Sequence, residues 1–253
     1  MEFKQPQLQI ARSYTPLPPS EYTINGDLRF LIRKEHMGEV SGYLHGLDVG
    51  AKVELRGPEL EIELPKEVEE VVFLAGGTGI APALQVIHTL LETKGNRNEI
   101  GGRPRIHIIW ANRRRADCEG GHDENATLAK GWSFWKRTPV PPARSQPPCI
   151  IVKELHDLQR KHEGHVFVDY VVDEEGTFID QKKIRQITQM SSDLKSGPVH
   201  DRLNKRLIFV SGPEGFVNAF AGPKKWVGGK EVQGKLGGVL GRMRLEDWKV
   251  YKL

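Results

Sequence analysis

The chain has 253 residues, of which 38% are hydrophobic and 28% are charged, which is the composition of one large or two smaller globular domains. Its 37 basic and 33 acidic residues leave a formal net charge of only +4, and their even spread along the chain argues against nucleic-acid binding. Two cysteines are too few for a disulfide framework.

The first 66 residues contain short alternating segments separated by proline, glycine and asparagine. Strands are expected at Gln7–Ala11, Leu28–Ile32 and Lys52–Leu55. Short strands with this spacing are typical of an antiparallel sheet or a small barrel. We therefore predict that residues 1–66 form an N-terminal domain of antiparallel strands.

Residues 67–253 alternate between strands and helices. Strands are expected at Val71–Ala75, Ile106–Ala111, His165–Val172 and Leu207–Ser211, and helices at Ile80–Lys94, Ile151–Lys161 and Ile179–Gln189. This alternation predicts a parallel sheet flanked by helices, with a ligand at the carboxyl ends of its strands. A proline-rich segment at about 117–148, which contains the aromatic cluster 132–135, breaks the pattern and is predicted to be an inserted loop.

The segment Val71–Pro82 is the strongest indication of a ligand site. An apolar strand leads through glycines into a helix whose first turn holds a proline, and those residues are Gly76, Gly77, Gly79 and Pro82. Glycines allow a tight turn and a close approach of the backbone to a ligand, and the start of the helix offers free N–H groups to an anion. A diphosphate site is predicted here, and a turn that only serves packing is the alternative.

A second group of anion-binding residue types precedes the sheet. Arg12 and Tyr14 stand at a strand end, where arginine suits a phosphate and tyrosine suits a flat ring. The backbone N–H groups and the hydroxyl of the segment Gly38-Glu39-Val40-Ser41 suit a second phosphate. An edge strand with a solvated arginine is the alternative for Arg12.

These motifs, in this order, resemble the ferredoxin–NADP reductase superfamily and most closely its cytochrome b5 reductase-like branch. Arg12-Ser13-Tyr14-Thr15-Pro16 is similar to the flavin signature, and the segment from Gly38 to Leu44 is similar to the pyrophosphate segment. Arg56-Gly57-Pro58 resembles the end of the flavin barrel, and the glycine turn resembles the pyridine-nucleotide turn. Ser211-Gly212-Pro213 stands where the family has Cys-Gly-Pro.

The resemblance implies an enzyme that holds FAD between barrel and sheet and takes hydride from NADPH or NADH. Arg12 would contact the FAD pyrophosphate, Tyr14 the isoalloxazine and Thr15 the flavin N5 region. Thr78 and Ser211 would lie beside the nicotinamide. Electrons would pass to a haem protein or to a small acceptor.

Three departures from the family pattern change these expectations. About one strand fits before the flavin signature, so the barrel is expected to be truncated at its N-terminus. Ser211 exchanges a soft sulfur for a hydroxyl, so slow hydride transfer is expected. The basic run Asn112-Arg113-Arg114 follows the second strand, where a 2′-phosphate would bind, and favours NADPH. Asp117 is near enough to serve a ribose hydroxyl instead.

The glycine-rich tail from Trp226 to Gly241 is similar to that of fungal mitochondrial flavoproteins that assist cytochrome c haem attachment. This narrower resemblance implies a mitochondrial inner-membrane protein facing the intermembrane space, with an anchor outside this chain. It also raises an alternative function, a catalytically weak assembly factor. Trp248 or Tyr251 would either stack on the flavin or take part in ordinary packing.

No metal site is predicted. Three histidines come close together in the sequence, at His156, His162 and His165, but they lack a carboxylate or cysteine at metal-like spacing. A helix end at the surface is expected there.

Overall fold

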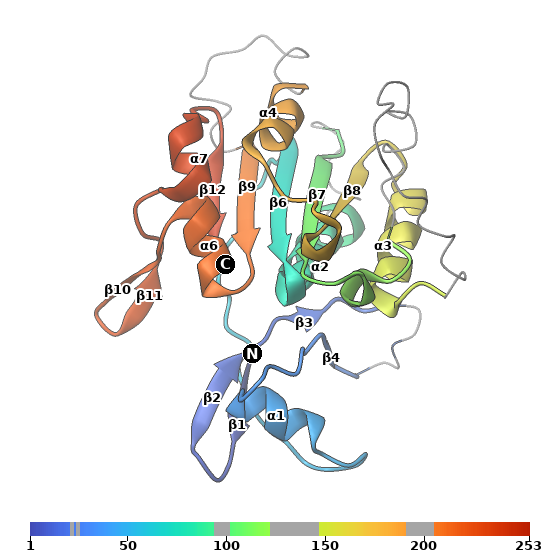
Figure 1. Cartoon of the computed structure of the whole chain (residues 1–253), viewed down its shortest axis with the longest axis vertical. Coiled ribbons are helices and arrows are strands. Elements are labelled where there is room, and N and C mark those ends of the chain that lie inside the picture. The colour runs from blue at the N-terminus through green and yellow to red at the C-terminus, as the bar shows by residue number, and fades with distance from the viewer. Residues whose placement is uncertain (21–22, 24–25, 94–101, 122–146, 191–204) are drawn as a thin grey trace.

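The computed structural model describes the chain except for residues 21–22, 24–25, 94–101, 122–146 and 191–204. It has two parts, a small antiparallel part near the N-terminus and a larger part built on a parallel sheet (Figure 1). The strands of the parallel sheet point toward the N-terminal part. The carboxyl ends of these strands, where parallel sheets bind ligands, therefore face the junction between the two parts.

The larger part contains a five-stranded parallel sheet in the order β12-β9-β6-β7-β8. Four strands confirm the predicted positions to within about two residues, because each is largely apolar. They are β6 (Glu70–Gly76), β7 (Arg105–Asn112), β8 (Val166–Val172) and β9 (Arg206–Ser211). The fifth strand, β12 (Lys249–Lys252), was not predicted and pairs with β9 at the sheet edge.

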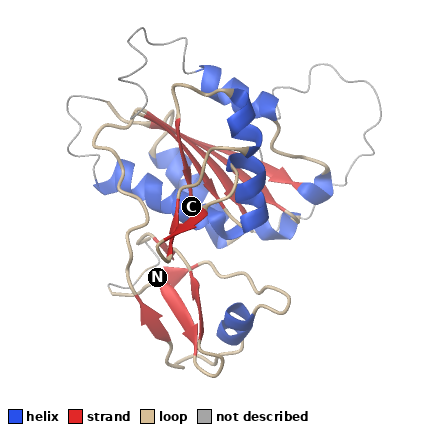
Figure 2. Cartoon of the chain, turned by 90° about the vertical axis from the view of Figure 1, so that its left-hand side faces the viewer, coloured by secondary structure: helices blue, strands red, loops and turns tan. Residues whose placement is uncertain are grey.

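Alternate residues of these strands enter two separate hydrophobic cores, one on each face of the sheet. On one face the core is closed by α2 (Ile80–Ile87) and α3 (Ile150–Lys161). On the other it is closed by α4 (Gln181–Met190), α6 (Glu214–Ala221) and α7 (Gly238–Met243). Figure 2 shows helices on both sides of the sheet. The predicted helix flanking of a parallel sheet is confirmed.

The helix expected over Ile80–Lys94 changes its geometry on the way. After α2 the chain continues as a π-helical segment at His88–Thr93, and Lys94 lies outside the described residues. Among the residues that the structure describes, no helix has both the length and the apolar character that crossing a bilayer requires.

The N-terminal part consists of antiparallel strands, as predicted, in two small sheets. The first has the order β2-β1-β5 and the second pairs β3 with β4. Their bounds are Glu2–Gln5 (β1), Ile10–Ser13 (β2), Pro16–Leu17 (β3), Arg29–Phe30 (β4) and Glu54–Arg56 (β5). The strands described here do not close into a barrel. A helix, α1 (Glu39–His45), packs on β1 and β2.

The predicted strand at Gln7–Ala11 is wrong in its first half. The chain turns at Pro6–Gln9, and β2 begins only at Ile10. Gln9 has a φ of +56°, a left-handed conformation that no strand contains. The alternation of Gln and Leu there reflects a hairpin turn between β1 and β2.

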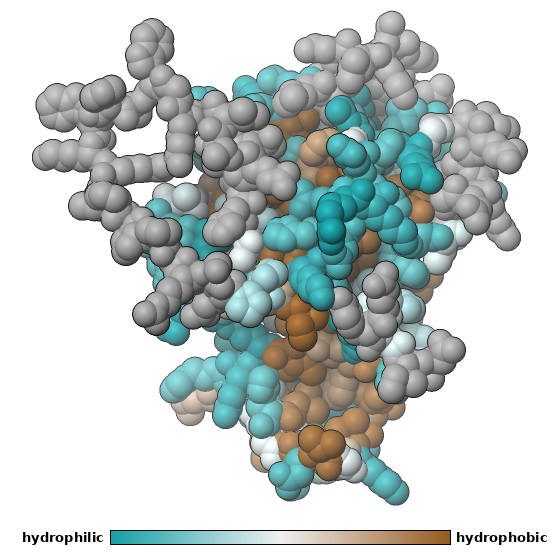
Figure 3. Space-filling view, turned by 90° about the vertical axis from the view of Figure 1, so that its right-hand side faces the viewer, coloured by the Kyte–Doolittle hydropathy of each residue, from teal (hydrophilic) through white to brown (hydrophobic). Residues whose placement is uncertain are grey.

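Apolar side chains gather at the surface of the N-terminal part (Figure 3). Within this part, the described apolar side chains that are buried are Phe3, Leu17 and Val40. A larger set is exposed, namely Leu8, Leu28, Met37, Val49, Val53, Leu55 and Leu60. The N-terminal part thus has little hydrophobic core of its own.

Polar contacts connect the N-terminal part to the sheet domain, and one of them joins Glu61 to Lys224 at 3.3 Å. Arg29 of β4 forms an ion pair with Glu154 of α3, and both side chains are largely buried. Arg33 lies 3.2 Å from Asp117. The Gln85 side chain of α2 donates a 2.7 Å hydrogen bond to the carbonyl of Pro16. These contacts fix the N-terminal strands against the helices that flank the carboxyl ends of the sheet.

The tail forms a hairpin and then returns to the sheet. Strands β10 (Lys225–Val227) and β11 (Lys230–Val232) make the hairpin. The buried ammonium group of Lys252 donates hydrogen bonds to the carbonyls of Pro223, Gly234 and Lys235, at 2.8–3.1 Å, and so holds the base of the hairpin against β12. Three acceptors offset much of the cost of burying that charge.

The aromatic residues of the tail take part in ordinary packing. Tyr251 stacks on Phe209 with ring centroids 5.3 Å apart, and Phe209 in turn stacks on Phe73. Trp248 is 6% exposed and lies under the guanidinium of Arg206. Of the two alternatives for these residues, the structure therefore shows the packing role.

Candidate functional site

Two turns meet at the carboxyl ends of β6 and β9, and glycines allow the meeting. A side chain on Gly79 would overlap the backbone carbonyl of Ser211. One on Gly212 would lie 2.9 Å from the carbonyl oxygen of Gly76, and Gly76 itself faces the ring of Phe216. Gly76 and Gly79 thus have a packing role, and their part in binding a ligand stays a prediction. Their packing brings the turn that holds Thr78 close to the buried Ser211.

Gly77 differs from its neighbours. Its φ is +53°, a left-handed conformation, and no atom lies within 4 Å of the position where a side chain would begin. Its carbonyl oxygen accepts a 2.8 Å hydrogen bond from the indole N–H of Trp110. Gly77 therefore leaves open space at the turn, and the ligand hypothesis applies to this glycine. Pro82 lies in the first turns of α2, as predicted.

The end of β7 lies next to this turn, because Gly76 pairs with Ala111. Asn112 is 4% exposed, and neither its amide nitrogen nor its amide oxygen has a hydrogen-bond partner. Leaving both polar atoms of a buried amide unsatisfied is costly. A ligand that binds at this strand end would supply the missing partners.

The charges that follow Asn112 fall into two groups. Arg115 forms an ion pair with Glu175 at 2.5 Å, and Asp117 lies 3.2 Å from Arg33 of the N-terminal part. Arg113 and Arg114 are exposed. The acidic alternative for ribose recognition is therefore engaged elsewhere, while two arginines remain available at the strand end.

The flavin-signature residues lie at the end of β2 and before β3. Arg12 is exposed, and its guanidinium lies 3.9 Å from the Glu39 carboxylate. Since Glu39 begins α1, Arg12 lies beside the segment Gly38–Ser41. Thr15 is half-buried between the two strands.

Tyr14 is held edge-on against Phe3, with ring centroids 5.6 Å apart. Burial raises the pKa of Tyr14; the nearby Arg12 charge partly opposes this, and the Glu35 charge adds to it. The phenol therefore stays protonated at neutral pH and is available as a hydrogen-bond donor.

The Ser41 hydroxyl is hydrogen-bonded within its own segment. It accepts a hydrogen bond from the Glu35 N–H at 3.1 Å and donates one to the Gly38 carbonyl at 3.3 Å. Ser41 is 5% exposed and Val40 is 1% exposed. Both side chains hold the start of α1 in place, and the role of this segment in binding a phosphate stays a prediction.

Two site residues were missed, Trp110 and Gln85. Both contact the predicted motifs through backbone carbonyls, Gly77 for Trp110 and Pro16 for Gln85. The one available signal was a tryptophan, with its polar N–H, inside a strand that ends beside the glycine turn. Gln85 gave no signal, because a polar residue on a helix is ordinarily solvated.

The histidine cluster differs from its expected place at the surface. His162 follows the last residue of α3 but is 4% exposed, and its ring nitrogen lies 2.5 Å from the Glu92 carboxylate. Burial raises the pKa of Glu92, but the hydrogen bonds from Lys161 and His162 outweigh burial and lower it overall. This contact joins α3 to the π-helical segment.

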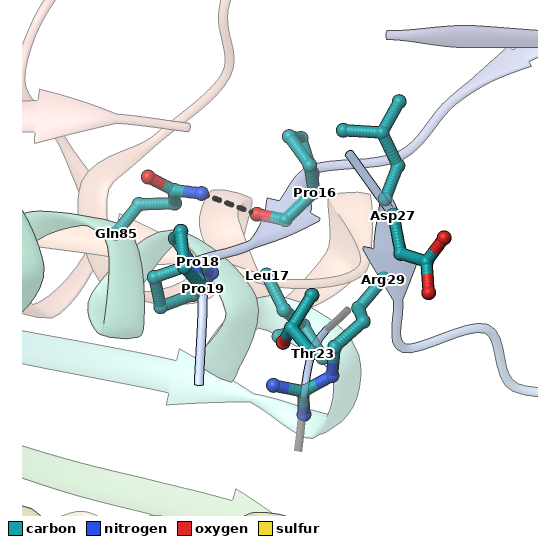
Figure 4. A pocket seen from close by; sticks show the side chains of 9 residues that line it. Pro16, Leu17, Pro18, Pro19, Thr23, Asp27, Arg29 and Gln85 are labelled. Atoms are coloured by element: carbon teal, nitrogen blue, oxygen red, sulfur yellow. Dashed lines mark hydrogen bonds between the residues drawn. The ribbon is translucent and has the colours of Figure 1, made fainter. Parts of the chain in front are cut away.

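A cavity of about 180 Å³ lies between β3, β4 and α2 (Figure 4). Its walls include Leu17, Thr23, Arg29 and Gln85. None of the predicted cofactor-binding residues lines it, and it is small for a dinucleotide. The glycine turn lies outside this cavity, and of the flavin signature only its last residue, Pro16, lines it.

The residues present fit the two cofactors implied by the motifs. A buried amide without partners at Asn112 and an open left-handed glycine at Gly77 suit a nucleotide at the ends of β6 and β7. Arg12 is an exposed cation beside the half-buried Tyr14, which suits a phosphate next to a flat ring.

Two family models match the chain. Residues 1–64 match the oxidoreductase FAD-binding domain, and residues 73–124 match the oxidoreductase NAD-binding domain. Among curated proteins, NADH-cytochrome b5 reductase 2 of Kluyveromyces lactis is 24% identical over 245 residues, and that of Meyerozyma guilliermondii is 26% identical over 251 residues. Each match covers 96% of this chain and 67% of the relative.

Solved structures agree in fold. The chain superposes on the CS-b5R domains of human Ncb5or with a TM-score of 0.58 and 15% identity, covering 99% of this chain and 58% of that one. For the cytochrome b5 reductase domain of Ulva prolifera nitrate reductase the TM-score is 0.51 and the identity 19%, with 86% and 74% covered. Two matched domains in the order of the motifs, together with these relatives, support the ferredoxin–NADP reductase superfamily and its cytochrome b5 reductase-like branch, and the domains are those of an oxidoreductase that binds FAD and NAD.

Proposed function

We propose that this protein takes hydride from NAD(P)H and passes the electrons through FAD to a haem protein. The observation that carries the proposal is the hydrogen bond from Gln85 to the Pro16 carbonyl. It ties the flavin-signature strand to the helix that begins at the glycine turn, so both cofactor motifs face the same junction. The relatives' names, which specify NADH and cytochrome b5, support this choice of donor and acceptor class.

The bound flavin would accept hydride as an electron pair and release the electrons singly, and the protein's part is alignment. Arg12 would neutralise phosphate charge, and the Tyr14 ring, already fixed by Phe3, would lie against the flavin. Thr15, Thr78 and Ser211 would orient the reacting rings. Ser211 is a hydroxyl held by packed backbone, so it can donate a hydrogen bond but lacks the polarizability of a sulfur.

The absorption spectrum tests the proposal. Purified protein loaded with FAD is expected to show flavin bands that NADPH or NADH bleaches under anaerobic conditions, and cytochrome c or b5 should then restore them. Protein with a flavin spectrum that neither nucleotide changes would contradict the proposal. Addition of dithionite, which reduces any bound flavin, is the control.

The arginines after β7 predict a preference for NADPH. Replacing Arg113 and Arg114 together with alanine is expected to raise the KM for NADPH about tenfold, because charge-assisted bonds to a 2′-phosphate are lost. The KM for NADH should stay unchanged. Arg242→Ala, in an exposed arginine of α7, is the matched control. Equal effects on both nucleotides would contradict the preference.

Two finer statements belong to the same proposal. The antiparallel strands of the N-terminal part would be a portion of a flavin-binding barrel, which the exposed apolar side chains there support. This part would end at residue 66, and the nucleotide-binding domain would begin at residue 67.

The mitochondrial location stays a prediction from the similarity of the tail. The assembly-factor role is the alternative to this proposal and also stays a prediction.

A further inference from the structure

We infer that Trp110 is a positioning residue that orients the Gly77–Thr78 peptide, so that its N–H faces the nucleotide diphosphate. The inference rests on the proposed binding of NAD(P)H at the glycine turn. It begins from the 2.8 Å hydrogen bond between the Trp110 indole N–H and the Gly77 carbonyl.

Within the turn itself, this peptide is held by a hydrogen bond from the Ile80 N–H to the Gly77 carbonyl. Gly77 adopts a φ of +53°, and no atom within 4 Å lies on the side where a side chain would be. Glycine adopts left-handed and right-handed conformations with nearly equal ease. A peptide that follows such a residue can rotate unless something holds it.

Trp110 supplies a second restraint from inside the sheet, in addition to the bond from the Ile80 N–H. It lies on β7, opposite Ala75 of β6, and is 2% exposed. Its ring packs at a tilted angle on Tyr170 of β8, with centroids 6.0 Å apart. Because the ring is fixed between two strands, its N–H selects one direction for the Gly77 carbonyl.

The direction of the carbonyl determines the direction of the next N–H. The Gly77–Thr78 peptide is trans, and in a trans peptide the C=O and N–H groups point to opposite sides. With its carbonyl turned toward Trp110, this peptide directs the Thr78 N–H away from the sheet core, toward the open side of the turn. An outward N–H is what an anion needs at the start of a helix.

Trp110→Phe tests this, since phenylalanine keeps a buried ring and removes only the N–H donor and part of the ring. The Gly77 carbonyl still accepts a hydrogen bond from the Ile80 N–H in the variant, so the turn should stay folded. Trp248→Phe is the matched control, because Trp248 is also buried but packs under Arg206, among the residues of the opposite core.

The probes are ADP-ribose, which carries the diphosphate, and adenosine, which does not. In calorimetric titrations of the full FAD-loaded chain, Trp110→Phe is expected to weaken ADP-ribose binding about fivefold to tenfold and to leave adenosine binding unchanged. The KM for NAD(P)H should rise with little change in kcat, with ferricyanide as acceptor. Trp248→Phe should change neither affinity.

Equal losses for both probes, or no loss for ADP-ribose in folded Trp110→Phe protein, would overturn the inference. Wild-type protein that binds neither probe would instead remove the proposed nucleotide site, and the inference with it. The two failures are distinguished by the wild-type titration alone.

Discussion

Replacing Arg29 with methionine is expected to lower the free energy of unfolding by roughly 3 kcal/mol, because it leaves the Glu154 carboxylate nearly buried without its cation. The lost ion pair is one that joins the two parts of the molecule, since Arg29 lies on β4 and Glu154 on α3. Urea unfolding curves measure the change: the shift in midpoint, multiplied by an m-value shared by both proteins, gives the difference in the free energy of unfolding.

The double variant Arg29→Met with Glu154→Leu separates a lost ion pair from lost packing. Without either charge, the stability should return to within about 1 kcal/mol of the wild type. Arg160→Met is the control, because Arg160 and its partner Asp157 are exposed and surface pairs contribute less than about 1 kcal/mol. A shift in Arg29→Met no larger than in Arg160→Met would show that the buried pair contributes little.

A methyl group at Gly79 is expected to destabilise the protein by about 3 kcal/mol and to abolish nucleotide binding. The new atom would overlap the backbone carbonyl of Ser211. Backbone cannot rotate away as a flexible side chain can, so the turns after β6 and β9 must separate. Thermal unfolding and titration with ADP-ribose measure the two effects.

Two other glycines serve as controls for the clash. Gly77→Ala meets no neighbouring atom but keeps a left-handed φ, so a cost of about 1 kcal/mol from backbone strain is expected. Gly215→Ala on α6 meets neither obstacle and should leave stability unchanged or slightly higher. If all three variants were equally stable, close packing of the two turns would not be what Gly79 provides.

The central strands were predictable, while the edge of the sheet was not. In β6 and β9 every residue is buried, so an apolar run with no polar interruption was a sufficient signal. Strand β12 begins with Lys249 and ends with Lys252, and its burial depends on Tyr251 stacking and on carbonyls supplied by the tail. These partners are distant in the sequence, so the β-propensity of the residues in the strand gives no information about them.

The candidate site, like the sheet, could be predicted from the sequence only in part. The positions of Gly77, Asn112 and Ser211 followed from motif order, because parallel strands bring their carboxyl ends to one edge. The sequence did not indicate which of the glycines packs against protein, because the close contact of Gly79 with Ser211 forms only in the folded chain. The engagement of Asp117 by Arg33 was equally hidden, because the partner belongs to the other part of the molecule.

The close contact between the turn after β6 and the turn after β9 also bears on how the protein acquires its function during folding. The two strands are neighbours in the sheet but far apart in the sequence, so a long loop must close before they can pair. The β6–β7–β8 half of the sheet joins strands that are nearer in sequence. Competence to bind nucleotide should therefore be among the last properties to return on refolding, after most of the helical signal has recovered.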